Sequence, residues 1–151
     1  MEVKIKKLVE NAVVPQYAHD TDAGLDLTAV SKEVDEYGNF VYHTGLAIEI
    51  PEGYAGFLFP RSSVSKYNLS LCNCVGVIDS AYRGEIILKF NEVIDYYVTG
   101  RKVNCKYKEE YNVGDRVAQL IILPYPKIKL VETDELSDSE RGNGGFGSTG
   151  V

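Results

Sequence analysis

The chain has 151 residues, of which 44% are hydrophobic and 25% are charged. This length predicts a single domain that can bury a core without disulfide bonds. The composition excludes collagen-like, coiled-coil and globally disordered proteins, and no run of about 18 apolar residues is present to cross a membrane. The first seven residues are charged and strand-like, so we expect no signal peptide.

The net charge is −6, and no Lys/Arg run is longer than two residues. Nucleic-acid binders usually carry a basic patch, so we expect neither nucleic acid nor a membrane as a partner. Five of the 16 basic residues are Arg, and each of them lies beside Ser, Gly or Asp. Arg binds phosphate through two parallel hydrogen bonds. These positions favour a small phosphorylated ligand, with structural ion pairs as the alternative.

Three cysteines without a signal sequence form a poor disulfide framework. Cys72 and Cys74 are two residues apart, Cys105 is remote, and two scattered histidines do not complete the ligand spacing of a zinc site. We therefore expect buried free thiols in a reducing compartment. The expected location is the cytoplasm, or the host cytoplasm if the source is viral.

Apolar residues recur with a period of two, which is typical of half-buried strands. The expected strands, in chain order, include residues 3–5, 41–42, 46–50, 86–90 and 117–123, and Gly, Pro and Asn turns separate them. Residues 62–67 are the one segment that could form a helix. Many short strands broken by turns predict an all-β sandwich or barrel.

The C-terminal segment has a different composition. An acidic run from 132 to 140 leads into a tail in which five of the 14 glycines fall within the last ten positions. Such a tail is too flexible to hold one conformation alone, and a frayed terminus is the simplest interpretation. However, Phe146 among glycines, with Arg141, Ser148 and Thr149 nearby, favours an arm that closes over a phosphorylated aromatic ligand. We expect residues 1–140 to form the domain and 141–151 to be its arm.

Five blocks carry the recognisable chemistry. They are the segments 22–27 (DAGLDL), 60–63 (PRSS), 76–84 (GVIDSAYRG), 114–120 (GDRVAQL) and 141–150 (RGNGGFGSTG). In this order they resemble the five motifs of the homotrimeric dUTPases, the deoxyuridine triphosphate nucleotidohydrolases. The resemblance implies an all-β, distorted jelly-roll barrel. It also implies a homotrimer with three active sites at subunit interfaces, each built from all three chains.

The implied reaction converts dUTP and water into dUMP and pyrophosphate with Mg²⁺, which supplies dUMP for dTTP synthesis and keeps uracil out of DNA. Water must attack the α-phosphorus in line, so a base must orient it. No motif contains His, so a carboxylate is the natural candidate. Asp79 matches the family's water-holding position, although a turn-capping Asp is the alternative reading. Asp26 matches a position that touches the hydrated metal. We expect no direct protein ligand, because Mg²⁺ is often held by phosphates and water.

The resemblance also assigns phosphate contacts. Arg61, Ser62 and Ser63 match the second motif, although Gly is common where Ser63 stands. Gln119 matches the fourth-motif residue near the phosphates and the water. Fixed donors of this kind stabilise the charge of the leaving pyrophosphate. Arg116 is either a further contact or an intersubunit ion pair. The tail residues implied in binding the terminal phosphate are Arg141, Ser148 and Thr149, and Gly147 is expected to bind the substrate as well.

Base selection is expected in a hairpin over about residues 71–87. Asn73 and the backbone near Val77, Ile78 and Ile87 match the groups that pair with uracil and leave cytosine unpaired. By the same resemblance, Tyr82 lies under deoxyribose and leaves no space for a 2′-hydroxyl. Phe146 stacks over the base when the arm closes.

Two alternatives remain open. A dCTP deaminase shares this fold, but Lys89 stands where that family carries a catalytic Glu. The other alternative is a regulatory binding protein that uses a dUTPase scaffold. The segment 91–113 is longer than the family pattern predicts, and we expect it to form an extended hairpin on the trimer surface.

Overall fold

Nine β-strands and one short 3-10 helix form the regular structure of residues 1–93 and 110–145, which the computed structural model describes. The tail residues 146–151 and most of the long 91–113 segment, residues 94–109, lie outside the described residues. The elements are β1 (Lys4–Lys7), β2 (Leu25–Thr28), β3 (Ser31–Val34), β4 (Phe40–Glu49), β5 (Tyr54–Pro60), η1 (Ser62–Lys66), β6 (Leu69–Leu71), β7 (Gly76–Ile78), β8 (Glu85–Glu92) and β9 (Arg116–Pro124).

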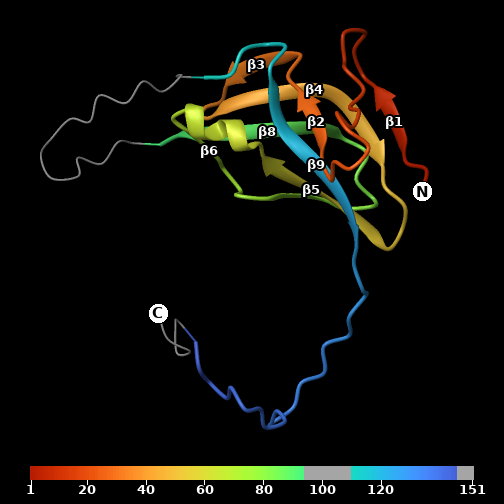
Figure 1. The fold of residues 1–151 in the computed structure, drawn as a ribbon, viewed down its shortest axis with the longest axis vertical. Helices are drawn as coiled ribbons and strands as arrows, with labels where there is room; N and C mark the ends of the chain where they lie inside the picture. Colours follow the sequence, from red (N-terminus) through yellow and green to blue (C-terminus); the bar gives the residue numbers. More distant parts are fainter. Residues whose placement is uncertain (94–109, 146–151) are drawn as a thin grey trace, which may run out of the picture.

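The strands form two antiparallel sheets (Figure 1). The first sheet has the order β1-β4-β8-β6, with β3 also paired to β4, and the second has the order β2-β9-β5-β7. Both sheets contribute to one apolar core, in which Tyr42 and Phe90 come from the first sheet and Leu27 and Leu120 from the second. This arrangement confirms the predicted all-β, jelly-roll-like fold.

The alternation of side chains explains why β8 forms. Ile86, Leu88 and Phe90 are buried, whereas Ile87 and Lys89 between them are exposed. Successive side chains of a strand point to opposite faces, so the same segment builds the core with one face and leaves Ile87 and Lys89 on the other. The 3-10 helix η1 confirms the helical expectation for residues 62–67, although it is a single short turn.

The segment 71–87 differs from the expected hairpin. Strand β7 pairs with β5 in the second sheet, whereas β8 pairs with β4 and β6 in the first sheet. The turn 79–84 therefore crosses from one sheet to the other instead of joining two paired strands.

The cysteine expectation was half right. Cys72 and Cys74 are free, but both are exposed. They lie in the turn between β6 and β7 rather than on a strand, and Cys74 has a positive φ of 58°. A tight turn leaves little room to bury short side chains, which explains their exposure.

After β9 the chain leaves the two sheets as an extended segment (Figure 1). Its first residues are tied to the turn after β4, because Tyr125 N–H donates to the Gly53 carbonyl at 2.9 Å. Farther along, the apolar side chains of Ile128, Leu130 and Leu136 are 75–89% exposed. No helix of the described residues is both long and apolar enough to cross a membrane.

Candidate active site

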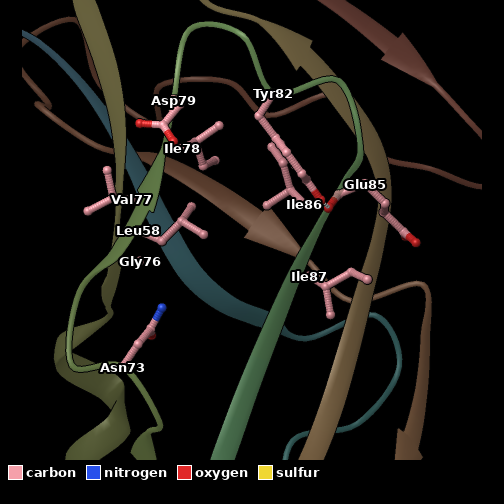
Figure 2. A pocket seen from close by; sticks show the side chains of 10 residues that line it. All are labelled: Leu58, Asn73, Gly76, Val77, Ile78, Asp79, Tyr82, Glu85, Ile86 and Ile87. Atoms are coloured by element: carbon pink, nitrogen blue, oxygen red, sulfur yellow. Dashed lines mark hydrogen bonds between the residues drawn. The ribbon is translucent and has the colours of Figure 1, made fainter.

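Two pockets contain nearly all described residues that the sequence nominated. The first, here called the turn pocket, has a volume of about 200 Å³ and lies beside the turn that joins β7 to β8. Its lining residues are Leu58, Asn73, Gly76, Val77, Ile78, Asp79, Tyr82, Glu85, Ile86 and Ile87 (Figure 2).

Asp79 and Tyr82 lie at the two ends of the arch formed by this turn (Figure 2). The Asp79 carbonyl accepts a hydrogen bond from the Tyr82 N–H at 3.0 Å, which closes the turn. The Asp79 side chain is exposed and makes no hydrogen bond within the described part of the chain. Because the backbone closes the turn and the carboxylate does not cap it, the carboxylate is free to bind a ligand or a water molecule.

The Tyr82 ring has a fixed position. Its hydroxyl donates to the Glu85 carbonyl at 2.9 Å. A side chain on Gly84 would collide with this ring, so glycine at 84 lets the aromatic face lie flat along the turn. Tyr82 is 46% exposed and lines the pocket.

The second pocket, here called the arginine pocket, has a volume of about 470 Å³ and gathers residues from the segment 18–24, from β2, from Arg61 between β5 and η1, from η1 and from β9. Strand register brings them together, because Asp26 lies opposite Gln119 in the β2–β9 pairing. Its lining residues are Ala18, His19, Asp22, Ala23, Gly24, Asp26, Arg61, Ser62, Arg116 and Gln119.

Asp26 is the electrostatic centre of this pocket. Its Oδ1 accepts a hydrogen bond from Arg61 Nε at 2.6 Å, and its Oδ2 accepts one from Arg116 Nη1 at 3.0 Å. The Asp26 and Arg61 side chains are about a quarter exposed, whereas Arg116 is 56% exposed. Asp22 also lines the pocket, so its two carboxylates balance its two guanidinium groups. The arginines therefore favour a polyphosphate through their directed N–H donors and not through a net positive charge.

Gln119 is held from two sides. Its Nε2 donates to the Pro60 carbonyl at 3.1 Å. Gly24 lies against its amide so closely that a Cβ there would be 2.5 Å from Gln119 Oε1. Glycine at position 24 of the DAGLDL block therefore leaves the space that the Gln119 amide occupies.

Ser63 does not line the pocket but supports Arg61, whose Nη1 lies 3.5 Å from Ser63 Oγ. The buried Tyr111 hydroxyl is close to both residues. Within the described residues it has no partner that meets the distance and angle criteria of a hydrogen bond. Burial raises the pKa of Tyr111, and the neighbouring Ser63 hydroxyl partly offsets this rise. The phenol therefore stays neutral near the arginine.

The sequence assignments can now be located. The turn pocket brings together the residues nominated for base, sugar and water, and the arginine pocket brings together Asp26, Arg61, Ser62 and Gln119. Arg141 lines neither pocket, and its Nε donates to the Gly144 carbonyl at 2.8 Å. The remaining nominated tail residues lie outside the described residues, namely Phe146, Gly147, Ser148 and Thr149.

Sequence reasoning missed three polar residues that line these pockets. His19 and Asp22 line the arginine pocket, and their side chains are 3.3 Å apart. Glu85 lines the turn pocket. Asp22 opens the DAGLDL block and could have been nominated from that position, whereas His19 and Glu85 carry no such signal.

Among the described residues, no three His, Cys, Asp or Glu side chains converge as a metal cage. Asp22 and Asp26 nevertheless lie in one pocket with phosphate-type donors. Carboxylates of this kind suit a hydrated Mg²⁺ that takes its other ligands from phosphates and water.

The chain is similar to known proteins over almost its whole length. The family model described as dUTPase matches residues 10–150. The deoxyuridine 5′-triphosphate nucleotidohydrolase of Alkaliphilus metalliredigens is 41% identical over 99% of this chain and 97% of its own. The corresponding protein of Crocosphaera subtropica is 39% identical over the full length of both chains.

Solved structures agree as well. The dUTPase of Staphylococcus bacteriophage 80alpha with dUpNHpp superposes with a TM-score of 0.78, at 32% identity and over 99% of both chains. A mutant dUTPase from phage phi11 of S. aureus, solved to describe the coordination of a structural Mg(II) ion, superposes with a TM-score of 0.69 at 30% identity, over 89% of this chain and 98% of its own. By its sequence and its fold, this chain belongs to the dUTPase family.

Proposed function

We propose that this protein hydrolyses dUTP to dUMP and pyrophosphate. The observation that carries the proposal is the turn pocket, which combines a free carboxylate at Asp79, a flat ring at Tyr82 and an amide at Asn73. These three groups suit the attacking water, the deoxyribose and a pyrimidine base. The full-length similarity to named nucleotidohydrolases and to a dUTPase bound to dUpNHpp supports the same substrate.

Uracil selection follows from the shape of this pocket. Asn73 and the backbone near Val77, Ile78 and Ile87 supply donors and acceptors beside apolar walls. Cytosine would leave buried polar groups unpaired, and such mismatches reject an analogue strongly. The Tyr82 ring under the sugar excludes a 2′-hydroxyl by leaving it neither space nor a partner.

The reaction is an in-line attack of water on the α-phosphorus. Asp79 orients the water and accepts its proton, as a general base must. Arg61, Ser62 and Gln119 hold the oxygens of the leaving pyrophosphate, where fixed donors stabilise the developing charge. Bound Mg²⁺ supplies positive charge to the phosphates, and Asp26 and Asp22 would attract the hydrated ion.

A homotrimer would complete the site. The turn pocket and the arginine pocket share no lining residue, yet the chemistry needs Asp79 and Arg61 at one triphosphate. Two copies of the chain can bring the two pockets together across an interface. The exposed apolar residues Ile128, Leu130 and Leu136 also need a covering surface, which a neighbouring subunit would supply.

The third contribution comes from the C-terminal arm. Residues 1–140 form the domain, and residues 141–151 belong to it as an arm that closes over a neighbouring site. Arg141, Gly147, Ser148 and Thr149 bind the terminal phosphate in this proposal, Ser63 supports Arg61 beneath it, and Phe146 covers the base. We place this activity in the cytoplasm, where it supplies dUMP and limits uracil in DNA.

The decisive experiment measures pyrophosphate release from dUTP, dTTP, dCTP and UTP, with and without Mg²⁺. We expect fast release from dUTP alone, and faster release with Mg²⁺. Comparable release from all four nucleotides would contradict the selectivity. Ammonia release from dCTP would instead favour the deaminase, against which stands the engagement of Lys89 with Asp35 at 3.0 Å.

A further inference from the structure

Glu85, the first residue of β8, lines the turn pocket and is anchored to a different strand. Its Oε1 accepts the Gly45 N–H at 2.7 Å, and its Oε2 accepts His43 Nδ1–H at 3.0 Å. Both contacts are to β4, 40 or more positions away in the sequence. The Glu85 and His43 side chains are only 23% and 25% exposed, so this carboxylate is bound rather than solvated.

The anchoring point is an irregularity in the sheet. The register between β4 and β8 shifts between His43 and Ala47. Gly45 has a φ of +66°, and any side chain there would collide with Val9. The irregularity frees the Gly45 N–H from the strand ladder, and the Glu85 carboxylate takes the place of the missing acceptor.

The main chain of Glu85 contacts the turn itself, through the Tyr82 side chain. Its carbonyl accepts the Tyr82 hydroxyl at 2.9 Å, and Figure 2 shows the tip of the Tyr82 ring directed at the Glu85 backbone. One residue therefore ties the turn 79–85 to β4 through its side chain and fixes the Tyr82 ring through its backbone.

We infer that Glu85 is a positioning residue of the nucleotide pocket, which sets the place of Tyr82 and Asp79 by clamping the turn 79–85 to β4. The inference rests on the proposed hydrolysis of dUTP. Glu85 touches neither the sugar nor the phosphate in this account. Its effect reaches the substrate through the ring that excludes ribose and through the carboxylate that holds the water.

Glu33 provides a matched control. Its carboxylate also faces His43, at 3.6 Å from Nε2, but it lies on β3, is 66% exposed and makes no contact with the turn. Glu33→Ala removes one of the two charges around His43 and leaves the clamp. Glu85→Ala removes the clamp, whereas Glu85→Gln keeps an oxygen that can accept the Gly45 N–H.

The test compares kcat/KM for dUTP and for UTP in the three variants and the unaltered protein. We expect Glu85→Ala to lower kcat/KM for dUTP by about tenfold to a hundredfold, because a displacement of about 1 Å has effects of this size. The preference for dUTP over UTP should narrow at the same time. Glu85→Gln should keep most of the preference, and Glu33→Ala should keep all of it.

Tyr82→Phe is a fourth variant. It removes only the hydroxyl that the Glu85 carbonyl binds, and it keeps the test valid if Glu85→Ala does not fold. It should also narrow the preference for dUTP over UTP. An unchanged preference in Glu85→Ala or in Tyr82→Phe overturns the inference, because a purely structural role changes stability but not selectivity. Absence of dUTP turnover in the unaltered protein contradicts the proposed function itself, so the two failures are distinguishable.

Discussion

Arg61 and Asp26 form an ion pair of 2.6 Å between the start of η1 and strand β2, and Arg116 binds the other oxygen of the same carboxylate. The pairing orients Arg61 before any ligand is present. It also leaves the Nη atoms of Arg61 unpaired with Asp26, and Nη1 lies 3.5 Å from Ser63 Oγ. An arginine held at Nε can present its remaining donors to phosphate without a loss of side-chain entropy on binding.

This geometry predicts different effects for two conservative changes. Arg61→Lys should lower kcat/KM for dUTP by about tenfold to a hundredfold, because lysine keeps the charge but loses the planar donors. Arg116→Lys should have a smaller effect, since Arg116 is half exposed and binds Asp26 from the rim. Steady-state kinetics on both variants measures the difference, and equal losses would refute the separate roles.

Asp79→Asn tests the general base. The variant should bind dUpNHpp with nearly unchanged affinity but turn over dUTP about 10²–10⁴-fold more slowly, since an amide cannot accept the proton of the water. Calorimetry gives the affinity and single-turnover kinetics gives the rate. An active variant would remove Asp79 from this role.

A second aspartate separates catalysis from turn capping. The Asp115 carboxylate accepts the Asn112 N–H at 2.8 Å within its own turn. Asp115→Asn should therefore cost some stability and leave kcat close to that of the unaltered protein. If Asp79 were only a turn cap, the two variants would behave alike.

The fold could be predicted only where the sequence pattern is local. The apolar runs at 86–90 and 117–123 predicted the strands β8 and β9. Strand β5 was missed, because Gly56 and Pro60 interrupt a segment rich in aromatic residues and hide its pairing with β9. Pairing depends on partners far along the chain, which no local pattern contains.

The candidate site was likewise predictable only in the residues that belong to local motifs. Motifs nominated Asp26, Arg61 and Gln119, and strand register then explains why they meet. Glu85 could not be nominated, because its importance depends on an irregular backbone position 40 residues away, at Gly45. The sequence around Glu85 contains no pattern that predicts its hydrogen bond with Gly45.

His43 makes stability depend on pH. Its hydrogen bond with Glu85 raises its pKa above the ordinary value, burial opposes this, and Glu33 adds to the rise. A raised folded-state pKa means that this contribution is complete below the unfolded value of about 6.5 and is lost as the pH rises through the folded value. We expect the free energy of unfolding to fall by about 1 kcal/mol across this range.

Denaturant unfolding at several pH values between about 5 and 9 measures this dependence. His43→Gln should be less stable than the unaltered protein at low pH and should lose less stability as the pH rises. A His43→Gln curve parallel to that of the unaltered protein would assign the pH dependence to other groups.

Gly24→Ala tests whether the position of the Gln119 amide matters for catalysis. The new Cβ would lie 2.5 Å from Gln119 Oε1, so the amide must move and lose its bond to Pro60. We expect kcat to fall by about tenfold or more, because small displacements of positioned groups have large effects. Gly38→Ala is the control. At Gly38, φ is +81° and nothing lies within 4 Å, so alanine should reduce stability through backbone strain and leave kcat unchanged.

Removal of residues 141–151 tests the arm. The shortened protein should keep its fold and its assembly state by light scattering, because the core lies in residues 1–120 and the exposed apolar side chains of 128–136 remain. The rate of dUTP turnover should fall to a small fraction of the original rate. A shortened protein with full activity would exclude the arm from the site.

Mixed assemblies then test whether the arm acts on a neighbouring subunit. Asp79→Asn chains lack the base but carry an arm, whereas shortened chains carry Asp79 but lack an arm. Each preparation alone should be nearly inactive. In trimers formed by co-refolding equal amounts, about one site in four should combine an intact Asp79 with an intact arm from another subunit, so activity should return to about that fraction. If each site used its own arm, no mixture could restore activity, because no single chain would hold both parts.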